Sequence, residues 1–285
     1  MKVHFAATEN VNQFNVIKAL GHKYNLYTAY PFLERQLFNK PISPLIPCQY
    51  KGNENEIPKY IIQNSKHAIQ DSGLFTLMFG SRSGKHEKAF LDKYYEALVS
   101  FTVKYSKGAT VVEMDTQKVL GVQSAWMYRK RLKADVPNRI INVFHLEDGR
   151  QGLDRLIEYS DYIALSVPEL RKTGKKNQLI KLAHYVKNKK PKIDIHLLGF
   201  SDTRIMSELR FCTSCDSSSY TSGVRYGAIG HNKVNNVDIV KTKKLISVDD
   251  YEQITKFISE KRACGLIINT RVEIDKYWTH AGGQD

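Results

Sequence analysis

Acidic and other polar side chains follow several short apolar runs in this sequence. They are Asp71, Asp115, His145, Glu169, Ser201 and Asp216. A carboxylate can attack an anomeric carbon and form a covalent glycosyl intermediate. A second carboxylic acid can protonate the leaving base and later deprotonate the incoming one. Two carboxylates at one site are therefore the minimum set for exchanging a group on a sugar without a metal.

The same aspartates have a simpler interpretation. An Asp at the end of a strand often caps the helix that follows it. For Asp71, Asp115 and Asp216 together this interpretation is weaker, because each comes directly after an apolar run and precedes small or apolar residues. We therefore expect the three carboxylates to share a site, which requires their charge or protonation to be managed.

Short apolar runs alternate with helical stretches along the chain, with no internal repeat and no linker. The predicted strands are Lys2–Ala7, Tyr24–Ala29, His67–Gln70, Ala109–Met114, Arg139–Phe144, Tyr162–Val167, Ile193–Leu198 and Phe211–Cys215. The predicted helices between them include Asn10–Leu20, Glu87–Tyr105, Gln117–Lys133, Leu153–Tyr159, Leu170–Lys189 and Thr203–Arg210. This order predicts an α/β fold, a (β/α)₈ TIM-type barrel, with a doubly wound open sheet as the alternative. In a barrel the strand-end residues meet at one mouth.

The region after Tyr220 has a different pattern. It contains one clear helix, Asp250–Lys261, and an apolar run, Gly265–Ile268. We predict that residues 1–220 form a catalytic barrel and that residues 221–285 form a C-terminal extension packed on the barrel as part of the same domain.

Basic residues are in excess and clustered. The 285 residues carry a formal net charge of +14, and nine Lys or Arg with no acidic residue lie between Arg171 and Lys192. Solvated helix faces are one explanation, but an imbalance of this size favours a polyanionic partner. The residues expected to contact nucleic-acid phosphates are Arg129, Arg131, Lys172, Lys175, Lys176, Lys187, Lys189 and Lys190.

Other features bound the function. No run of about 18 apolar residues is present, so no membrane span is expected, and the N-terminus lacks a signal-peptide pattern, which predicts a cytoplasmic protein. Cys212 and Cys215 form a single C-x-x-C pair, with Cys48 and Cys264 elsewhere. A zinc site needs a second pair of ligands, so we expect no metal and no cofactor. The oligomeric state stays open.

Four segments, in order, resemble the tRNA-guanine transglycosylase superfamily. Asp71-Ser72-Gly73-Leu74-Phe75-Thr76 is similar to its D-S-G-G-[FY]-Q segment, and His196-Leu197-Leu198-Gly199-Phe200 is similar to its [HY]-L-[ML]-G-[VI]-G strand. Val111–Asp115 resembles the strand that ends in the base-reading Asp, and Ile163–Glu169 is a weaker match to the G-G-[LF]-A-V-G-E loop. The resemblance covers residues 1 to about 220.

The resemblance implies roles for individual residues. Asp216 would be the nucleophile on C1′, and Asp71 the general acid and base. The base would be bound by Ser72, Phe75, Asp115, His145, Ala164, Leu165, Glu169 and Gly199. Among these, Phe75 would stack on the base, and Asp115 would accept hydrogen bonds from its N–H groups.

Differences from the family pattern indicate which branch of the superfamily the chain resembles. Leu74 and Thr76 replace a Gly and a Gln, Pro168 interrupts the loop, and neither the zinc motif nor an RNA-binding domain follows. In this the chain resembles the compact, phage-type DNA 7-deazaguanine transglycosylases (DpdA-like), which would place a phage-encoded enzyme in the host cytoplasm. The resemblance implies that guanine in DNA is exchanged for a free 7-deazaguanine base. The alternatives are a tRNA-acting enzyme and a catalytically inactive barrel that binds nucleic acid.

Overall fold

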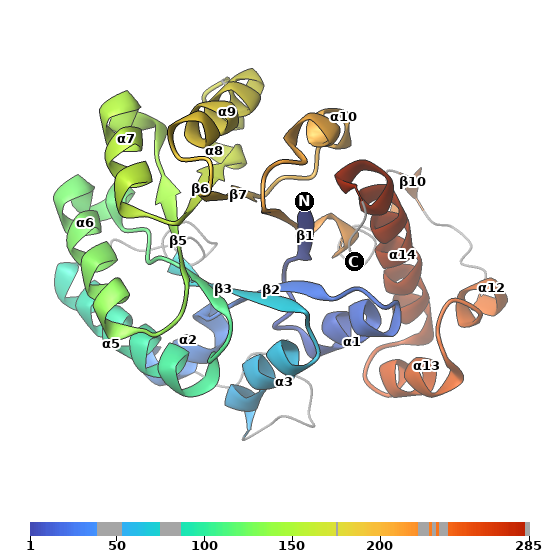
Figure 1. The fold of residues 1–285 in the computed structure, drawn as a ribbon. Coiled ribbons are helices and arrows are strands. Elements are labelled where there is room, and N and C mark those ends of the chain that lie inside the picture. Colours follow the sequence, from blue (N-terminus) through green and yellow to red (C-terminus); the bar gives the residue numbers. More distant parts are fainter. Residues whose placement is uncertain are drawn as a thin grey trace.

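Eight parallel strands form a closed barrel in the computed structural model, which describes residues 1–38, 53–74, 87–174, 176–221, 228–229, 232–233 and 239–282 (Figure 1). The strands are β1 (Lys2–Phe5), β2 (Tyr24–Thr28), β3 (His67–Asp71), β4 (Thr110–Val112), β5 (Ile140–Phe144), β6 (Tyr162–Ser166), β7 (Asp194–Leu198) and β8 (Ser214–Ser217). They pair in chain order, and β8 closes the barrel against β1. The predicted (β/α)₈ barrel is confirmed, and the open sheet is not observed.

Helices surround the barrel and cover its outer face (Figure 1). Those before β8 are α1 (Val11–Ala19), α2 (Tyr30–Phe38), α3 (Ile57–Gln63), α5 (Lys88–Tyr105), α6 (Gln117–Asp135), α7 (Gly149–Tyr159), α8 (Val167–Lys172), α9 (Leu179–Lys189) and α10 (Thr203–Met206). After β8 come a two-stranded antiparallel pair, β9 (Ala228–Ile229) and β10 (Asn232–Lys233), and the helices α12 (Ile239–Lys243), α13 (Val248–Thr255) and α14 (Glu260–Ala281).

Two of the predicted helices are each divided between two separate helices, and a third, α6, is kinked at Gly121 (φ +79°). The basic stretch Leu170–Lys189 is divided between α8 and α9, because Gly174 takes a left-handed conformation (φ +72°) after Lys172. The predicted helix Asp250–Lys261 is likewise divided between α13 and α14. The apolar run Gly265–Ile268 lies inside the 22-residue helix α14, where Leu266 and Ile267 are buried.

Alternation along the strands separates two apolar layers. In β6, Tyr162 and Ala164 belong to a cluster inside the barrel, whereas Ile163 and Leu165 pack outward under the helices. Polar side chains also lie in the barrel interior. His4 Nε2, from β1, lies 2.8 Å from His67 Nδ1, at the start of β3. The interior thus holds both an apolar cluster and a group of polar contacts.

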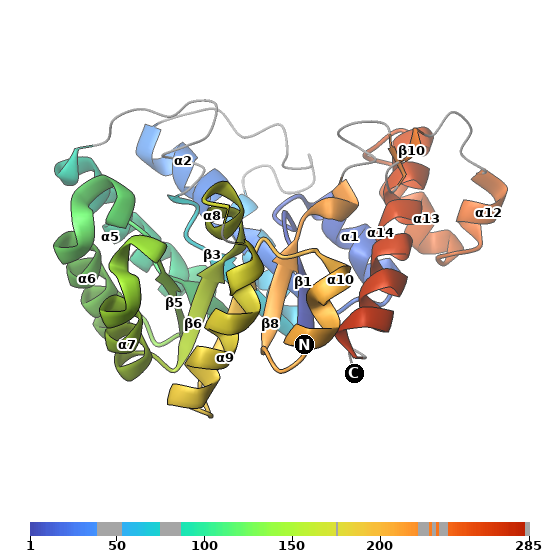
Figure 2. The same ribbon diagram turned by 90° about the horizontal axis from the view of Figure 1, so that it is seen from above.

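The last helix is part of the ring. Helix α14 contacts α1, α10 and β1, so it lies between the first and last helices of the barrel (Figure 1). The N-terminal amine of Met1 donates to the Ala281 carbonyl at 3.1 Å. Both termini thus lie at the lower end of the barrel in Figure 2, where the strands begin. Within the described ranges, no helix has the length and apolar character needed to cross a membrane.

Candidate active site

A cavity of about 500 Å³ opens at the C-terminal ends of the strands. The predicted residues Asp71, Ser72, Asp115, His145 and Asp216 all line it. Other polar residues in its wall are Glu9, Thr28, Glu113, Lys118, Ser166 and Ser218. The carboxylates that the sequence placed at separate strand ends therefore share one site.

The Asp71 carboxylate is held by a tight turn after β3. The Gly73 N–H donates to Asp71 Oδ1 at 2.7 Å. Gly73 has φ +76°, and a Cβ at this position would lie 2.4 Å from Tyr30 Cβ. Only glycine fits this turn without displacing α2, because a side chain would meet both the strained conformation and the neighbouring helix. The Asp-Ser-Gly sequence thus fixes the carboxylate through its backbone.

Asp71 has an unusual protonation equilibrium. Burial raises the pKa of its carboxyl to about 6, and the negative charges of Asp216 and Asp115 act in the same direction, against the hydrogen bond from Gly73. A carboxylic acid in this range can give and take a proton near neutral pH.

Asp216 lies in β8, and two donors from β7 and its end hold one of its oxygens. Gly199 N–H donates to Asp216 Oδ1 at 2.8 Å, and His196 Nε2 lies 3.1 Å from the same atom. Among the described residues Oδ2 has no hydrogen-bond partner, and the side chain is 13% exposed. The free oxygen is the one that can attack.

Gly199 also has a steric role at the end of β7. Its φ is +62°, and a Cβ there would lie 3.0 Å from Pro168 Cγ. The left-handed turn allows its N–H to reach across to Asp216, so the glycine acts through its backbone. It orients the carboxylate through this hydrogen bond, and its contact with a base stays a prediction.

A directed chain of hydrogen bonds lies below Asp216. The buried His196 Nδ1 is 2.6 Å from Ser214 Oγ, which is 2.5 Å from the Tyr162 hydroxyl. With Asp216 ionised, His196 must carry its proton on Nε2 and accept on Nδ1. Ser214 then donates to His196, and Tyr162 donates to Ser214. Every donor of the chain thus points toward the carboxylate.

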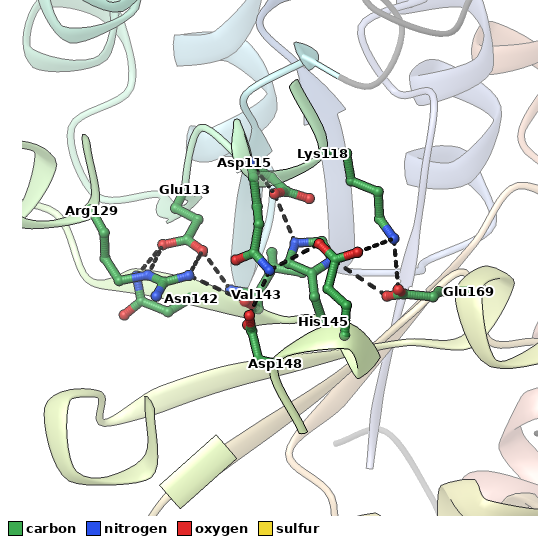
Figure 3. A network of polar contacts seen from close by, with 11 residues as sticks. Glu113, Asp115, Lys118, Arg129, Asn142, Val143, His145, Asp148 and Glu169 are labelled. Carbon is green, nitrogen blue, oxygen red and sulfur yellow. Dashed lines mark hydrogen bonds and ion pairs between the residues drawn. The ribbon is translucent and has the colours of Figure 1, made fainter. Parts of the chain in front are cut away.

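The opposite wall of the cavity is an ion-paired network (Figure 3). His145 Nε2 lies 2.8 Å from Asp115 Oδ1, and its Nδ1 lies 3.4 Å from Glu169 Oε2. Lys118 Nζ lies 2.8 Å from Glu169 Oε1. Burial alone would lower the pKa of His145, but the two carboxylates raise it to about 10. Despite burial, His145 and Lys118 lower the pKa of Glu169 to about 2, so all three are charged at neutral pH.

A second, deeper pair lies next to this network. Arg129 donates from Nε and Nη2 to the two oxygens of Glu113 at 2.7 and 2.6 Å, and both side chains are at most 4% exposed. Asn142 Nδ2 and the Val143 N–H also donate to Glu113, at 2.6 and 2.9 Å. Arg129 therefore cannot contact a phosphate, and its predicted role is corrected. It supports the cavity wall by neutralising a buried carboxylate.

Two predicted base-contacting residues lie away from the cavity. The resemblance implies that the backbone of Ala164 and Leu165 lines the base site, but neither residue is in the cavity wall. Ala164 is buried inside the barrel, Leu165 packs under the helices, and their neighbours Ser166 and Pro168 line the cavity. An alignment of sequence motifs does not show which residue is the last of a strand, so it cannot tell which residues reach the cavity. Phe75, predicted to stack on the base, lies outside the described residues.

The predicted phosphate contacts are distributed over two ends of the barrel. Lys172 is exposed on α8, which follows β6 at the mouth. Lys187 and Lys190, at the other end of the barrel, donate to the carbonyls of Ile193 and Ser160 at 2.6 and 2.7 Å and so fix the turn before β7.

The remaining predicted contacts have partners or are not described. Lys189 lies 3.7 Å from Asp154, and Arg131 lies 3.8 Å from Asp92. Lys175 and the side chain of Lys176 are outside the described part of the chain. Lys172 is thus the one predicted residue seen exposed at the mouth.

The cysteines are buried and unpaired where they are described. Cys212, Cys215 and Cys264 are free thiols, and burial raises the pKa of Cys212 to about 12. Cys48 lies outside the described residues. Within those residues, no group of three or more His, Cys, Asp or Glu side chains is arranged to hold a metal ion.

The sequence interpretation missed His196, Lys118 and Glu113. A signal existed for His196, since it is a polar residue in an otherwise apolar strand segment, Ile195–Leu198. No local signal identifies the partner of Glu113, because Arg129 is reached only when α6 packs against the barrel. No protein-family model matches this chain, and no curated protein matches it, so the resemblance rests on the segments quoted above.

Proposed function

We propose that the protein is a base-exchange transglycosylase that replaces guanine in DNA with a 7-deazaguanine derivative. The observation that carries the proposal is the difference between two carboxyls in one cavity. Asp71 has a pKa of about 6, whereas Asp216 has one oxygen held by Gly199 and His196 and the other free. This combination of a proton donor and an oriented nucleophile matches double displacement at a sugar carbon.

In the first step Asp216 Oδ2 attacks C1′ of the target nucleotide. The C1′–O bond to Asp216 forms as the C1′–N9 bond breaks, and the electron pair of that bond goes to the departing guanine. Protonated Asp71 gives its proton to the guanine and becomes a carboxylate. The hydrogen bonds to Oδ1 of Asp216 keep the carboxylate oriented during attack.

In the second step the incoming 7-deazaguanine gives its N9 proton to the Asp71 carboxylate. Its N9 then attacks C1′, and the ester bond to Asp216 breaks. Asp71 is protonated again and Asp216 is ionised, so the enzyme returns to its starting state without a cofactor. Because the first base leaves before the second enters, this order gives ping-pong kinetics.

The ion-paired wall of the cavity is suited to recognising the base. Asp115 uses Oδ1 for His145 and for a long contact with the Gln117 N–H at 3.4 Å. Its Oδ2 has no partner within the described residues, so it is the acceptor for guanine-type N–H groups. Both ring N–H groups of the His145 imidazolium face carboxylates, those of Asp115 and Glu169, so His145 orients Asp115 and has no donor left for the base.

The target base must leave its stack before this chemistry. The C1′–N9 bond of a paired base is shielded inside the duplex, and the carboxylates lie inside a cavity. The base must be flipped out, or already unpaired, at a cost of a few kcal/mol. Phosphate contacts would position the strand without reading sequence, and Lys172 beside the mouth suits this role.

The test is incorporation of a labelled base. Purified protein is incubated with radiolabelled guanine or 7-deazaguanine and with either duplex DNA, single-stranded DNA or tRNA. We expect label in DNA and none with Asp216→Asn, while Asp249→Asn, an exposed change on α13, exchanges like the wild type. Label only in tRNA would make the tRNA enzyme the correct alternative. Binding without exchange on any substrate would indicate the inactive barrel.

A further inference from the structure

A second pocket lies at the lower end of the barrel, away from the mouth. It has a volume of about 460 Å³ and is formed between the loop from α1 to β2, the start of β3 and the last turns of α14. We call it the lower pocket, and its wall includes Lys23, Tyr24, Lys66, Arg271, Ile274 and Trp278. The mechanism above uses none of these residues.

Two lysines of the lower pocket are fixed side by side. The Lys66 N–H donates to the Lys23 carbonyl at 2.8 Å, so the backbone register of β2 and β3 places them next to each other. Both are exposed, and neither has an ion-pair partner within the described ranges. Lys2 lies close by, with Nζ 6.0 Å from the centre of the Tyr24 ring. Cations on neighbouring strands that lack partners attract an anion to the pocket.

The other cation of the pocket is already neutralised. Arg271 forms a two-point contact with Asp275, at 3.0 Å from Nε to Oδ2 and 3.0 Å from Nη2 to Oδ1. The positive charge that remains for a ligand is therefore on the lysines. It lies on the strand side of the pocket, opposite the helix.

An aromatic surface lies on the helix side. Trp278 is 51% exposed, although most large apolar side chains of α14 face the core. It lines the pocket one helical turn from Ile274. An exposed indole beside unpaired lysines is the arrangement that binds a nucleotide, because a base stacks on the ring while a phosphate meets the cations.

We propose that the lower pocket binds one nucleotide unit, with its base on Trp278 and its phosphate beside Lys23 and Lys66. A free nucleotide and a nucleotide within a single strand share this chemistry. The site is separate from the cavity at the mouth, so the proposal does not depend on the base-exchange reaction.

Tryptophan fluorescence of the full chain tests this directly. The chain has two tryptophans, and Trp126 is only 8% exposed, so quenching by a stacked base reports on Trp278. The protein is titrated with GMP, with an eight-nucleotide single strand, with inorganic phosphate and with polyglutamate. We expect quenching by GMP or the single strand, and competition without quenching by inorganic phosphate.

Paired lysine variants distinguish binding in the lower pocket from nonspecific attraction of an anion to the positively charged protein. Lys23→Ala with Lys66→Ala should weaken nucleotide binding about tenfold. Lys93→Ala with Lys130→Ala removes the same charge from exposed positions on α5 and α6 and should have little effect. Asp216→Asn should quench like the wild type, which keeps this test independent of the proposed reaction.

The titrations identify the ligand as a free nucleotide or a nucleic acid strand, or they overturn the proposed site. Equal affinity for GMP and the single strand indicates a free nucleotide, whereas binding of the strand alone indicates a nucleic acid that contacts the lower end. Absence of quenching, equal weakening by both lysine pairs, or displacement of the nucleotide by polyglutamate at equal charge would overturn the proposal.

Discussion

The two halves of the cavity at the mouth manage negative charge in different ways. In the ion-paired half, Asp115 and Glu169 are matched by His145 and Lys118 through direct contacts. In the carboxyl half, Asp71 and Asp216 have no Lys or Arg partner within the described residues. Instead, burial of Asp71 and repulsion from Asp216 raise the pKa of the Asp71 carboxyl.

The two ways of compensating negative charge suit different functions, recognition and proton transfer. Ion pairs hold their partners in place and keep their charge over a wide pH range, as recognition requires. A carboxyl that changes protonation near neutral pH transfers protons. In the proposed reaction, the ion-paired half would recognise the base and the carboxyl half would carry out bond exchange. The predictions below change one half at a time.

Among the variants that keep the Asp216 nucleophile, the largest kinetic effect is expected from Asp71→Asn. The variant keeps an acceptor for the Gly73 N–H but has no proton to give to the leaving guanine. The rate of base departure should fall by about 10²–10⁴-fold, whereas DNA binding stays unchanged. Single-turnover release of labelled guanine, beside filter binding, measures both. A comparable loss in Asp249→Asn would mean that the effect is not specific to the carboxyl half.

A smaller effect is expected from Asp115→Asn in the ion-paired half. The amide presents a donor as well as an acceptor toward guanine-type N–H groups and weakens the contact with His145. Loss of one such hydrogen bond costs about 1–3 kcal/mol, which is roughly 5–150-fold in kcat/KM for the incoming base. The loss should appear mainly in KM. A fall confined to kcat would indicate that Asp115 acts in bond exchange and not in base recognition.

His196 should act through Asp216 and not on the substrate. His196→Leu removes one donor to Asp216 Oδ1 while Gly199 remains, so we expect a loss of about tenfold in the rate of adduct formation. His196→Gln, which keeps a donor at the Nε2 position, should restore the rate. An unchanged rate of adduct formation in His196→Leu would leave His196 a packing residue only.

The smallest effect concerns stability. The pKa of Asp71 is about 6 in the folded protein against 3.8 for the ordinary side chain, so the folded state binds the proton more tightly than the unfolded one. The wild type therefore loses stability as the pH rises from about 4 to above 6. Asp71→Asn removes this loss, and the variant should become more stable than the wild type at pH 7 by an amount on the order of 1–3 kcal/mol. Urea unfolding at pH 4, 6 and 8 measures the difference, and a constant difference would contradict the assigned pKa.

The alternation of apolar runs and helical periods was sufficient to predict the barrel. Each of the eight predicted strands overlaps an observed one, because burial on both faces leaves a near-continuous apolar run in the sequence. The α8–α9 break was not predicted, since Gly174 in a basic stretch has the pattern of a tolerated helix residue. Helices α2 and α3 were not predicted either.

The carboxylates of the site were predictable from the sequence, but their partners were not. Asp71, Asp115 and Asp216 were identified because they end apolar runs, and the structure brings them to one cavity. The burial of Arg129 against Glu113 was not predictable, because a basic residue on a helix looks the same in sequence whether it faces solvent or a buried carboxylate. Which strand-end loop supplies a donor to Asp216 depends on the closure of β7 against β8.

The covalent adduct tests the central claim most directly. A labelled oligonucleotide is incubated with the wild type, Asp216→Asn, Asp71→Asn or Asp249→Asn without added base, and the products are separated on a denaturing gel. We predict an adduct with the wild type and Asp249→Asn, a slowly formed one with Asp71→Asn and none with Asp216→Asn. An adduct that persists in Asp216→Asn, or one that is lost only in Asp71→Asn, would contradict the assignment of the nucleophile.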